Sequence, residues 1–232
     1  MLPILYQDAH LVAIDKPAGL LVHRTGLDAG ETRFAVQLLR EQIGQPVWPV
    51  HRLDKGTSGV LVFALGADAA SATCSLFESS LGIVKRYQAV VRGWPAAEGV
   101  IDHPLKRLPD DARASPRALP AQAAVTRFRT LSRHAVPLPY GDFPQTRCAL
   151  LELQPETGRR HQLRRHCKHM GHPIIGDATH GKGPLNRALA QWLGWRRLWL
   201  HAASLQLPHP VSGEPLRIEA PPGVEWARWQ GA

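Results

Sequence analysis

Hydrophobic positions along the chain predict short strands separated by only a few helices. Two apolar runs, residues 4–6 and 11–14, flank a polar turn and are typical of a β-hairpin. Further along, apolar residues recur every two to four positions from Phe34 to Ile43, which is the spacing of one helix face. Thr32 precedes this run and is the expected N-cap of the helix.

The next segments continue this mixture of elements. An apolar strand is predicted at 60–64, a helix at 66–81 with Asp68 near its start, and a half-buried strand at 84–91. The remaining expected elements are four strands and one basic helix, at 124–130, 148–154, 203–207 and 216–219 for the strands and 159–169 for the helix.

The order of these elements predicts a fold class. Strands outnumber helices and the two do not alternate regularly, which favours an α+β fold with a mixed, mostly antiparallel sheet over a doubly wound parallel one. The stretches 95–122 and 137–145 are rich in proline and are expected to be surface loops. Because no internal repeat or long linker divides the chain, residues 1–232 are expected to form a single domain.

Composition and charge narrow the function classes. The 232 residues are 44% hydrophobic and 20% charged, which allows a buried core and excludes global disorder. Lysine and arginine number 28 against 19 aspartates and glutamates, and the net charge of +9 favours a polyanionic partner, above all nucleic acid. No apolar run approaches the roughly 18 residues of a membrane span and no signal peptide is visible, so a cytoplasmic protein without membrane contact is expected.

Cysteine usage points to a reducing compartment. Cys74, Cys148 and Cys167 are odd in number and include no Cys-x-x-Cys pair. This pattern argues against both a disulfide framework and a zinc site built from thiolates.

The densest polar cluster is residues 51–59, directly before the apolar strand at 60–64. Asp54 lies between Arg52 and Lys55, whose positive charges favour its carboxylate form, available as a nucleophile or base. The alternative is an ordinary turn in which Asp54 and Thr57 only cap backbone groups.

A second cluster, residues 158–169, contains five lysines or arginines and three histidines. Helical spacing gives His161, Arg164, Arg165 and Lys168 overlapping faces, so several cations could bind phosphates together. Two alternatives stay open, a solvated basic face and a zinc site. The candidate zinc ligands are His161, His166, Cys167, His169 and His172.

The order of motifs along the chain resembles the RluA family of pseudouridine synthases. The resemblance rests on His51-Arg52-Leu53-Asp54 with Thr57-Ser58-Gly59, on Lys85-Arg86-Tyr87, and on Gly158-Arg159-Arg160-His161-Gln162-Leu163-Arg164-Arg165-His166. Supporting matches are Asp15-Lys16-Pro17, Pro173-Ile174-Ile175-Gly176-Asp177 and Leu198-Trp199-Leu200-His201-Ala202. It runs from about Ile4 to Pro221 and implies the pseudouridine synthase fold, with flanking helices and a central basic catalytic cleft.

The resemblance implies roles for individual residues. Asp54 corresponds to the essential catalytic aspartate, and Arg164 is expected to pair with its carboxylate. Tyr87, which on a strand could otherwise be a core or edge aromatic, is expected to line the pocket under uracil. Arg52 is expected to help displace the target base. RNA contacts are expected from His51 and from three cations of the basic segment, Arg159, Arg165 and Lys168.

The implied reaction is isomerisation of uridine to pseudouridine, which demands no metal, nucleotide or redox cofactor. Within the family, the chain looks most like the branch that modifies the uridine at position 65 of tRNA. Its partner is therefore expected to be tRNA, and the chain is expected to act as a monomer. Ribosomal RNA is the alternative substrate, and an RNA-binding protein without catalysis is the remaining alternative.

Overall fold

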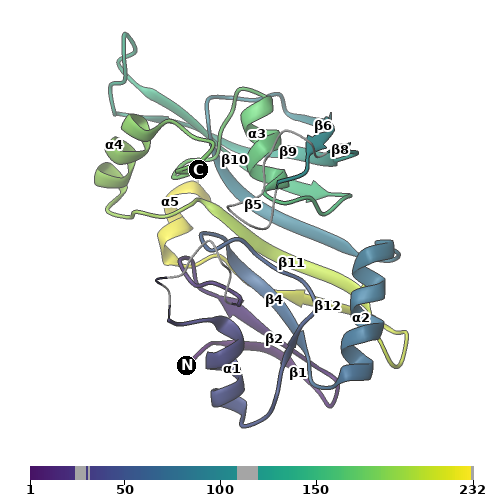
Figure 1. Cartoon of the computed structure of the whole chain (residues 1–232). Coiled ribbons are helices and arrows are strands. Elements are labelled where there is room, and N and C mark those ends of the chain that lie inside the picture. The colour runs from purple at the N-terminus through teal and green to yellow at the C-terminus, as the bar shows by residue number, and fades with distance from the viewer. Residues whose placement is uncertain (24–29, 31, 109–119, 231–232) are drawn as a thin grey trace. The chain divides into compact units, whose positions relative to one another are not determined.

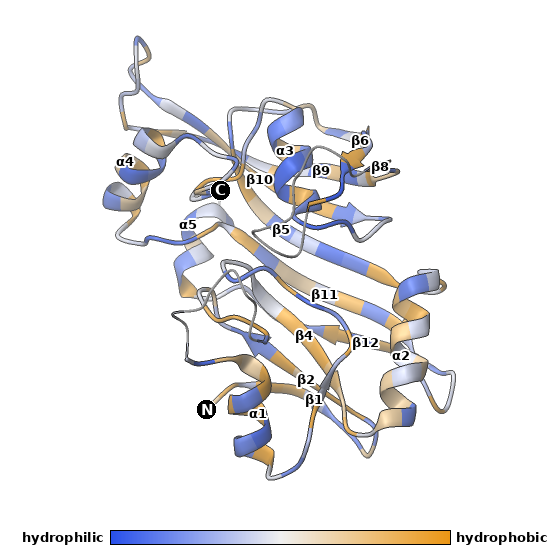
Figure 2. Cartoon of the chain, in the orientation of Figure 1, coloured by the Kyte–Doolittle hydropathy of each residue, from blue (hydrophilic) through white to orange (hydrophobic). Residues whose placement is uncertain are grey.

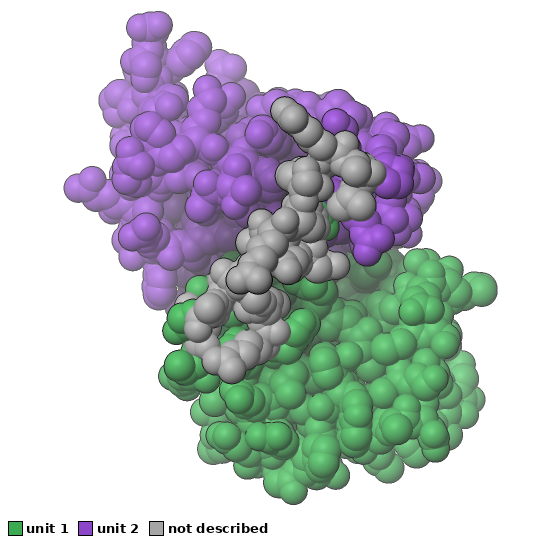
Figure 3. Space-filling view, in the orientation of Figure 1, with its two compact units in different colours: residues 1–85, 108–119, 202–221 green, residues 86–107, 120–201, 222–232 purple. Residues whose placement is uncertain are grey.

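The fold is described by a computed structural model that covers residues 1–23, 30, 32–108 and 120–230. Contacts divide the chain into two compact units, coloured separately in Figure 3. The first unit consists of residues 1–85, 108–119 and 202–221, and the second of 86–107, 120–201 and 222–232. Each unit therefore combines segments that are far apart in the sequence.

The first unit is built on antiparallel strand pairs (Figure 1). β1 (Ile4–Gln7) pairs with β2 (Leu11–Lys16), and β2 pairs with β4 (Ser58–Ala64). The predicted N-terminal hairpin is thus confirmed. Its turn is fixed by Asp8, whose Oδ1 accepts the N–H groups of His10 and Leu11 at 2.7 Å each.

Three further strands form antiparallel pairs in this part of the chain. β3 (Trp48–Pro49) pairs with β4, and β12 (Pro215–Glu219) pairs with β11 (Leu200–Pro208), both antiparallel. All seven residues of β4 are buried, as the apolar run predicts. Figure 2 shows the hydrophobic colouring of this strand.

Two helices lie in the described residues of the first unit, α1 (Ala35–Ile43) and α2 (Ala67–Ser79). Both were predicted, but the expected cap at Thr32 is wrong. The N-cap of α1 is Phe34, in extended backbone and without a side-chain cap, because the helix starts three residues after Thr32. Ala69 of α2 is buried in a cluster with β2 and β4 side chains, which attaches this helix to the strands.

Four strands of the second unit pair in the order β5-β10-β9-β6, all antiparallel. Their bounds are Val84–Arg92 for β5, Glu98–Asp102 for β6, Val125–Val136 for β9 and Thr146–Pro155 for β10. β7 (Leu105–Lys106) and β8 (Ala121–Gln122) form a separate pair.

The expected surface loop at 95–122 is therefore wrong in part. Five of its residues form β6, whose Ile101 is buried, and the short strands β7 and β8 also fall within it. The sequence did not indicate this strand, because it is surrounded by proline, alanine and charged residues. Its hydrogen-bonding partner, β9, lies far along the chain. Residues 109–119 of the expected loop lie outside the described residues.

Four helical segments are found where the structure describes the second unit. They are α3 (Gln162–His169), α4 (Gly183–Leu193), the single 3₁₀ turn η2 (Val224–Trp226) and α5 (Ala227–Gln230). α3 starts three residues later than predicted, because His161 has a left-handed backbone with φ 54°. In the described part of the chain, no helix has the length and apolar character needed to cross a membrane.

The helical segments η2 and α5 each bury a tryptophan for which the sequence analysis predicted no role. Trp226 and Trp229 pack edge-on against Trp199, at ring-centroid distances of 5.2 and 5.8 Å. All three indoles are at most 1% exposed. The tail after Pro221 thus completes the hydrophobic core of the second unit.

Gly59 is a point where only glycine fits, and it adjoins the polar loop at 51–57. Its φ is +107°, and an added Cβ would lie 2.2 Å from the carbonyl oxygen of Ala202. Gly59→Ala is expected to lower the free energy of unfolding by about 3 kcal/mol or more, from backbone strain and overpacking together. Chemical denaturation measures this loss.

The matched control is Gly66→Ala at the N-cap of α2. That position has extended backbone with φ −166°, and a Cβ there meets no atom within 4 Å. A change of less than about 1 kcal/mol is expected. Equal effects of the two substitutions would contradict the steric account of Gly59.

Candidate functional site

Asp54 lies in a tight turn at the end of the polar loop. The turn is closed by the Thr57 N–H, which donates to the Asp54 carbonyl at 3.0 Å. Leu53 and Thr57 are buried on either side, whereas Asp54 is half-buried. The loop is therefore a turn, as one interpretation predicted, and Asp54 within it is still partly accessible, as a catalytic role would require.

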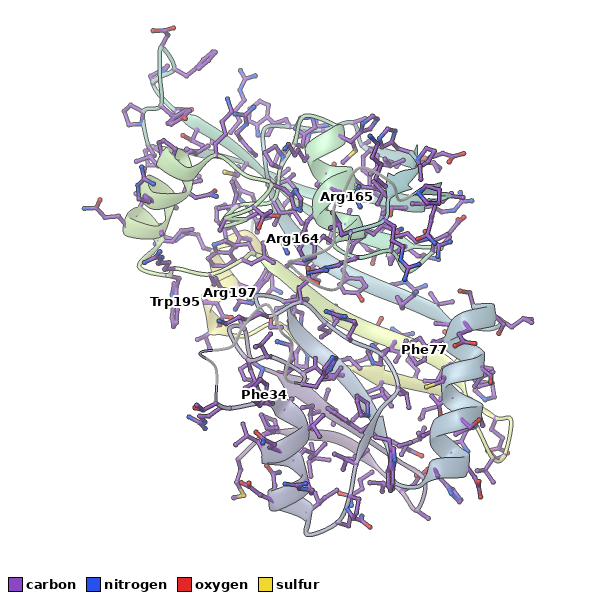
Figure 4. All side chains as sticks on the ribbon, in the orientation of Figure 1. Phe34, Phe77, Arg164, Arg165, Trp195 and Arg197 are labelled. Atoms are coloured by element: carbon purple, nitrogen blue, oxygen red, sulfur yellow. The ribbon has the colours of Figure 1, made fainter. Side chains whose placement is uncertain are left out.

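His51 anchors the beginning of this loop. Its Nε2 accepts the N–H of Val62 on β4 at 3.0 Å, and its ring stacks on Phe77 of α2 at 4.7 Å between centroids. Figure 4 labels Phe77 on that helix. Burial, and then the charge of Lys85, lower the pKa of His51 to about 3. The ring is consequently neutral at physiological pH, and its expected RNA contact stays a prediction.

Arg52 is the exposed cation of the loop. Its charge, after the larger effect of burial, lowers the pKa of His23 in the same unit. Arg52 therefore contributes positive potential beside Asp54, in keeping with a group that could meet a phosphate.

Arg164 and Arg165 adjoin each other on α3, but their surroundings differ (Figure 4). Arg164 is 8% exposed and binds Asp177 through two bonds, Nε to Oδ2 and Nη2 to Oδ1, both 2.8 Å long. Asp177 is 1% exposed. Such a bidentate pair fixes the plane of the guanidinium and so the orientation of Arg164.

Asp177 also organises the chain that follows it. Its Oδ1 accepts the N–H groups of Thr179 and His180 at 2.9 Å each. Burial acts to raise the pKa of Asp177, but the bonds and charge of Arg164 and these two N–H groups outweigh it and lower the pKa. Asp177 is thus a buried anion. Its role within the motif at 173–177 is to bind Arg164 and the backbone of the residues that follow it.

A directed chain of hydrogen bonds holds α3 against β9. The Thr157 hydroxyl donates to Gln162 Oε1 at 2.8 Å, and Gln162 Nε2 donates to Thr126 Oγ1 at 3.0 Å. His166 is next, with Nδ1 at 2.9 Å from Thr126 Oγ1 and Nε2 at 3.1 Å from the His103 carbonyl. Because a carbonyl only accepts, Nε2 carries the proton and Nδ1 accepts from Thr126.

Two of the predicted phosphate-binding cations each donate a hydrogen bond to a backbone carbonyl. Arg165 Nη1 donates to the Lys106 carbonyl at 2.9 Å, and Arg159 Nε donates to the Ala123 carbonyl at 3.0 Å. These two bonds attach β7 and the residue after β8 to α3 and the turn before it. Lys168 is exposed. Each arginine has five N–H donors, so one bond to a carbonyl leaves it capable of binding phosphate.

Tyr87 lies on β5 opposite Leu153 of β10. Its ring is partly buried and packs on the hydrophobic core of the second unit. Both readings of Tyr87, as a core-edge aromatic and as a surface for a base, agree with this position.

The zinc reading of the basic segment is not supported by the geometry. Both nitrogens of His166 already have partners, and burial raises the pKa of the Cys167 thiol to about 12. His103 stacks on His169 at 3.7 Å, while His161 contacts His180. Over the described ranges, no three side chains of metal-binding type are grouped to hold an ion.

The predicted site residues thus fall into both units. His51, Arg52 and Asp54 belong to the first, while Tyr87, Arg159, Arg164, Arg165 and Lys168 belong to the second. Residue-level reasoning missed the structural roles of Asp177 and Gln162. The motif match at 173–177 was the available signal for Asp177, but nothing in the spacing indicated its partner, Arg164, 13 residues earlier.

The buried pair predicts a pH-dependent stability. Asp177→Asn keeps an oxygen for the Thr179 and His180 N–H groups but removes the negative charge that binds Arg164. We expect a loss of about 3–5 kcal/mol at pH 7. The folded pKa of Asp177 lies below the unfolded value of about 3.9, so its contribution is present above that pH and is lost as pH falls through the folded pKa.

Denaturation curves of both proteins from pH 3 to 7 measure this effect. The difference between them should shrink below about pH 4. Glu156→Gln, which removes the exposed partner of Arg127, is the control and should cost less than about 1 kcal/mol. A difference between wild type and Asp177→Asn that does not vary with pH would contradict the ionised pair.

Comparison with known proteins identifies the family. The sequence pattern of RNA pseudouridylate synthase matches residues 10–169. The tRNA pseudouridine synthase C of Vibrio cholerae is 48% identical over 233 residues, covering 100% of this chain and 94% of that relative.

Two solved human structures have the same fold. The Human RNA Pseudouridylate Synthase Domain Containing 1 aligns with a TM-score of 0.74 at 26% identity, covering 96% of this chain and 84% of that one. The Human RNA Pseudouridylate Synthase Domain Containing 4 aligns with a TM-score of 0.70 at 31% identity, covering 98% and 93%. The resemblance that the order of motifs carries is confirmed, and the chain belongs to the RNA pseudouridylate synthase family.

Proposed function

We propose that this chain isomerises uridine to pseudouridine in tRNA, at position 65, with Asp54 as the catalytic carboxylate. The assignment of tRNA as the substrate is supported by the 48% identity, over the whole chain, to a relative named tRNA pseudouridine synthase C. A cytoplasmic location and a monomeric state, both expected from the sequence, are part of this proposal.

The chemistry exchanges one bond of the nucleoside for another. The bond between ribose C1′ and uracil N1 breaks, uracil turns, and C5 joins C1′ while its hydrogen leaves and N1 gains a proton. No electrons or groups are gained or lost overall, so side chains suffice. Asp54 suits the part of the carboxylate, because its turn is fixed at both ends while its side chain stays partly accessible.

Three other residues are proposed to assist Asp54. Arg52, exposed next to it, would help displace the base from its stack, which an enzyme acting inside folded RNA must do. Tyr87 would offer its ring to the uracil. Arg164 would orient the catalytic carboxylate by pairing with it, and its bidentate bond to Asp177 supports this role by fixing the guanidinium plane.

RNA backbone contacts are proposed for the exposed edges of α3 and the turn before it. Arg159, Arg165 and Lys168 supply positive charge there, consistent with the net charge of +9. His51 is the weakest of the proposed RNA contacts, because its ring is neutral and held between Val62 and Phe77.

The role of Asp54 predicts loss of turnover with RNA binding retained. Transfer RNA labelled with tritium at uracil C5 releases the label when C5 bonds to C1′. Wild type is expected to release it, and Asp54→Asn to release it at least about 10³-fold more slowly with an unchanged dissociation constant for tRNA.

The control is Asp68→Asn, which removes an exposed carboxylate from the first turn of α2. It should release tritium at the wild-type rate. Full activity of Asp54→Asn would exclude this residue as the catalytic carboxylate. If wild type released tritium from ribosomal RNA but not from tRNA, the proposed reaction would stand and the proposed substrate would be wrong.

The proposed RNA surface predicts a change in salt dependence. The double variant Arg159→Ala, Arg165→Ala should bind tRNA more weakly, and the slope of log K against log salt should flatten by about 1.4–1.8 if each arginine contacts one phosphate. Arg187→Ala, Arg217→Ala removes the same charge from two exposed positions and should leave the slope nearly unchanged. Equal flattening by both double variants would mean that net charge alone, without a defined surface, governs binding.

A further inference from the structure

Exposed aromatic and basic side chains gather where the chain leaves β5, and neither the motifs nor the reaction gives them a role. Residues 93–97, the crossing segment, connect β5 to β6 and pass β10 and β9, which lie between those two strands in the sheet. Trp94 of this segment is 40% exposed, and Arg133 of β9 and Arg147 of β10 are exposed as well. All of these residues belong to the second unit.

The backbone of the crossing segment is bonded to both strands that it passes. The Gly93 N–H donates to the Arg147 carbonyl of β10 at 2.6 Å. At the other end, Thr130 of β9 donates its N–H to the Ala97 carbonyl and its hydroxyl to the Ala96 carbonyl, each at 2.7 Å. Because the segment is held at both ends, the side chains that it carries have defined positions.

Gly93 sets the direction in which the crossing segment leaves β5. Its φ is +84°, in the left-handed region, and an added Cβ would lie 2.8 Å from His172 Nδ1. The His172 ring is itself fixed, because its Nδ1–H donates to the Arg92 carbonyl at 2.8 Å. The start of the segment is therefore closely packed, and Trp94 follows directly.

Trp94 is held at the surface in a fixed orientation. Its Nε1–H donates to the His134 carbonyl at 3.2 Å, and the Arg147 guanidinium lies over its ring, 4.5 Å from the centroid. A second guanidinium adjoins the segment, because Arg133 Nη2 donates to the Pro95 carbonyl at 2.7 Å. An indole stacked with one arginine and flanked by another combines a surface for a nucleobase with positive charge for phosphates.

The charges of these two arginines are not neutralised inside the unit. Elsewhere on β9, Arg127 and Arg129 each bind a glutamate. Among the residues that the structure describes, neither Arg133 nor Arg147 forms an ion pair with a carboxylate. Two exposed positive charges beside an exposed indole are therefore available to an anionic partner.

We propose that Trp94, Arg133 and Arg147 form a binding site for tRNA, in which a nucleobase stacks against the Trp94–Arg147 pair and both guanidinium groups contact phosphates. The inference rests on tRNA as the proposed substrate and adds a contact to those proposed for α3. At about 3.3 Å per strand residue, Arg133 lies roughly 20 Å along β9 from Thr126, to which α3 is bonded. Substitutions at the two places should therefore act independently.

Trp94→Ala tests the stacking contact. Loss of one base stacked on an aromatic ring corresponds to about 5- to 100-fold weaker binding, so the dissociation constant for tRNA should rise by that factor. The slope of log K against log salt should stay unchanged, because the indole carries no charge. Trp94→Phe keeps an aromatic ring and should stay within about threefold of wild type.

The matched control for Trp94→Ala is Trp195→Ala. Trp195 also belongs to the second unit and is 49% exposed, so the control removes an equally large exposed ring. It should bind tRNA within about twofold of wild type. Wild-type affinity of Trp94→Ala, or equal losses in the two variants, would overturn the proposal.

A second variant leaves the indole in place and covers the case in which Trp94→Ala does not fold. Arg133→Ala, Arg147→Ala should weaken tRNA binding and flatten the salt slope by about 1.4–1.8, for one phosphate contact per arginine. The control is Arg127→Ala, Arg129→Ala, which removes the same charge from arginines already paired with glutamates. It should leave the slope nearly unchanged, and equal flattening by both double variants would reject the site.

Kinetics separate a role in binding from a role in turnover. At saturating tRNA, Trp94→Ala should release tritium from uracil C5 at the wild-type single-turnover rate, because the site contributes binding alone. A slower rate at saturation would contradict this. If wild type releases no tritium from any RNA, the proposed catalytic function fails, whereas the dissociation constants of the variants still decide whether this site binds tRNA.

Discussion

Asp54, the proposed catalytic carboxylate, is carried by a turn, where no repeating backbone pattern fixes its position. The structure meets this constraint with bonds to the backbone of the turn. Lys16 and Gly19 bind the carbonyl of Lys55, Thr57 closes the turn, and His51 attaches its beginning to β4. The side chain of Asp54 stays partly accessible while its backbone is fixed from several sides.

In the second unit, α3 carries the cations proposed to bind RNA beside residues that face the interior. Arg164 is oriented by a bidentate bond to a buried anion, and Gln162 and His166 attach the helix to β9 through Thr126. With these bonds satisfied inside the unit, exposed Lys168 and half-exposed Arg165 can meet an anionic partner. The helix is thus both a structural support and a charged surface.

Much of this organisation could be predicted from the sequence because it depends on neighbours in the chain. The hairpin at β1 and β2, the buried strand β4 and the helix α2 follow local alternation and spacing. The late start of α3 could not be predicted, because the left-handed backbone of His161 has no signal in residue type. Long-range pairing explains the other misses, such as β6 on β9 and the burial of Trp229.

The most direct test of the central claim is a map of pseudouridines in total RNA from a strain that lacks this gene. The account predicts the loss of one pseudouridine, at position 65 of tRNA. A copy encoding the wild-type chain should restore it, and a copy encoding Asp54→Asn should not. An unchanged tRNA map, or restoration by Asp54→Asn, would contradict the account.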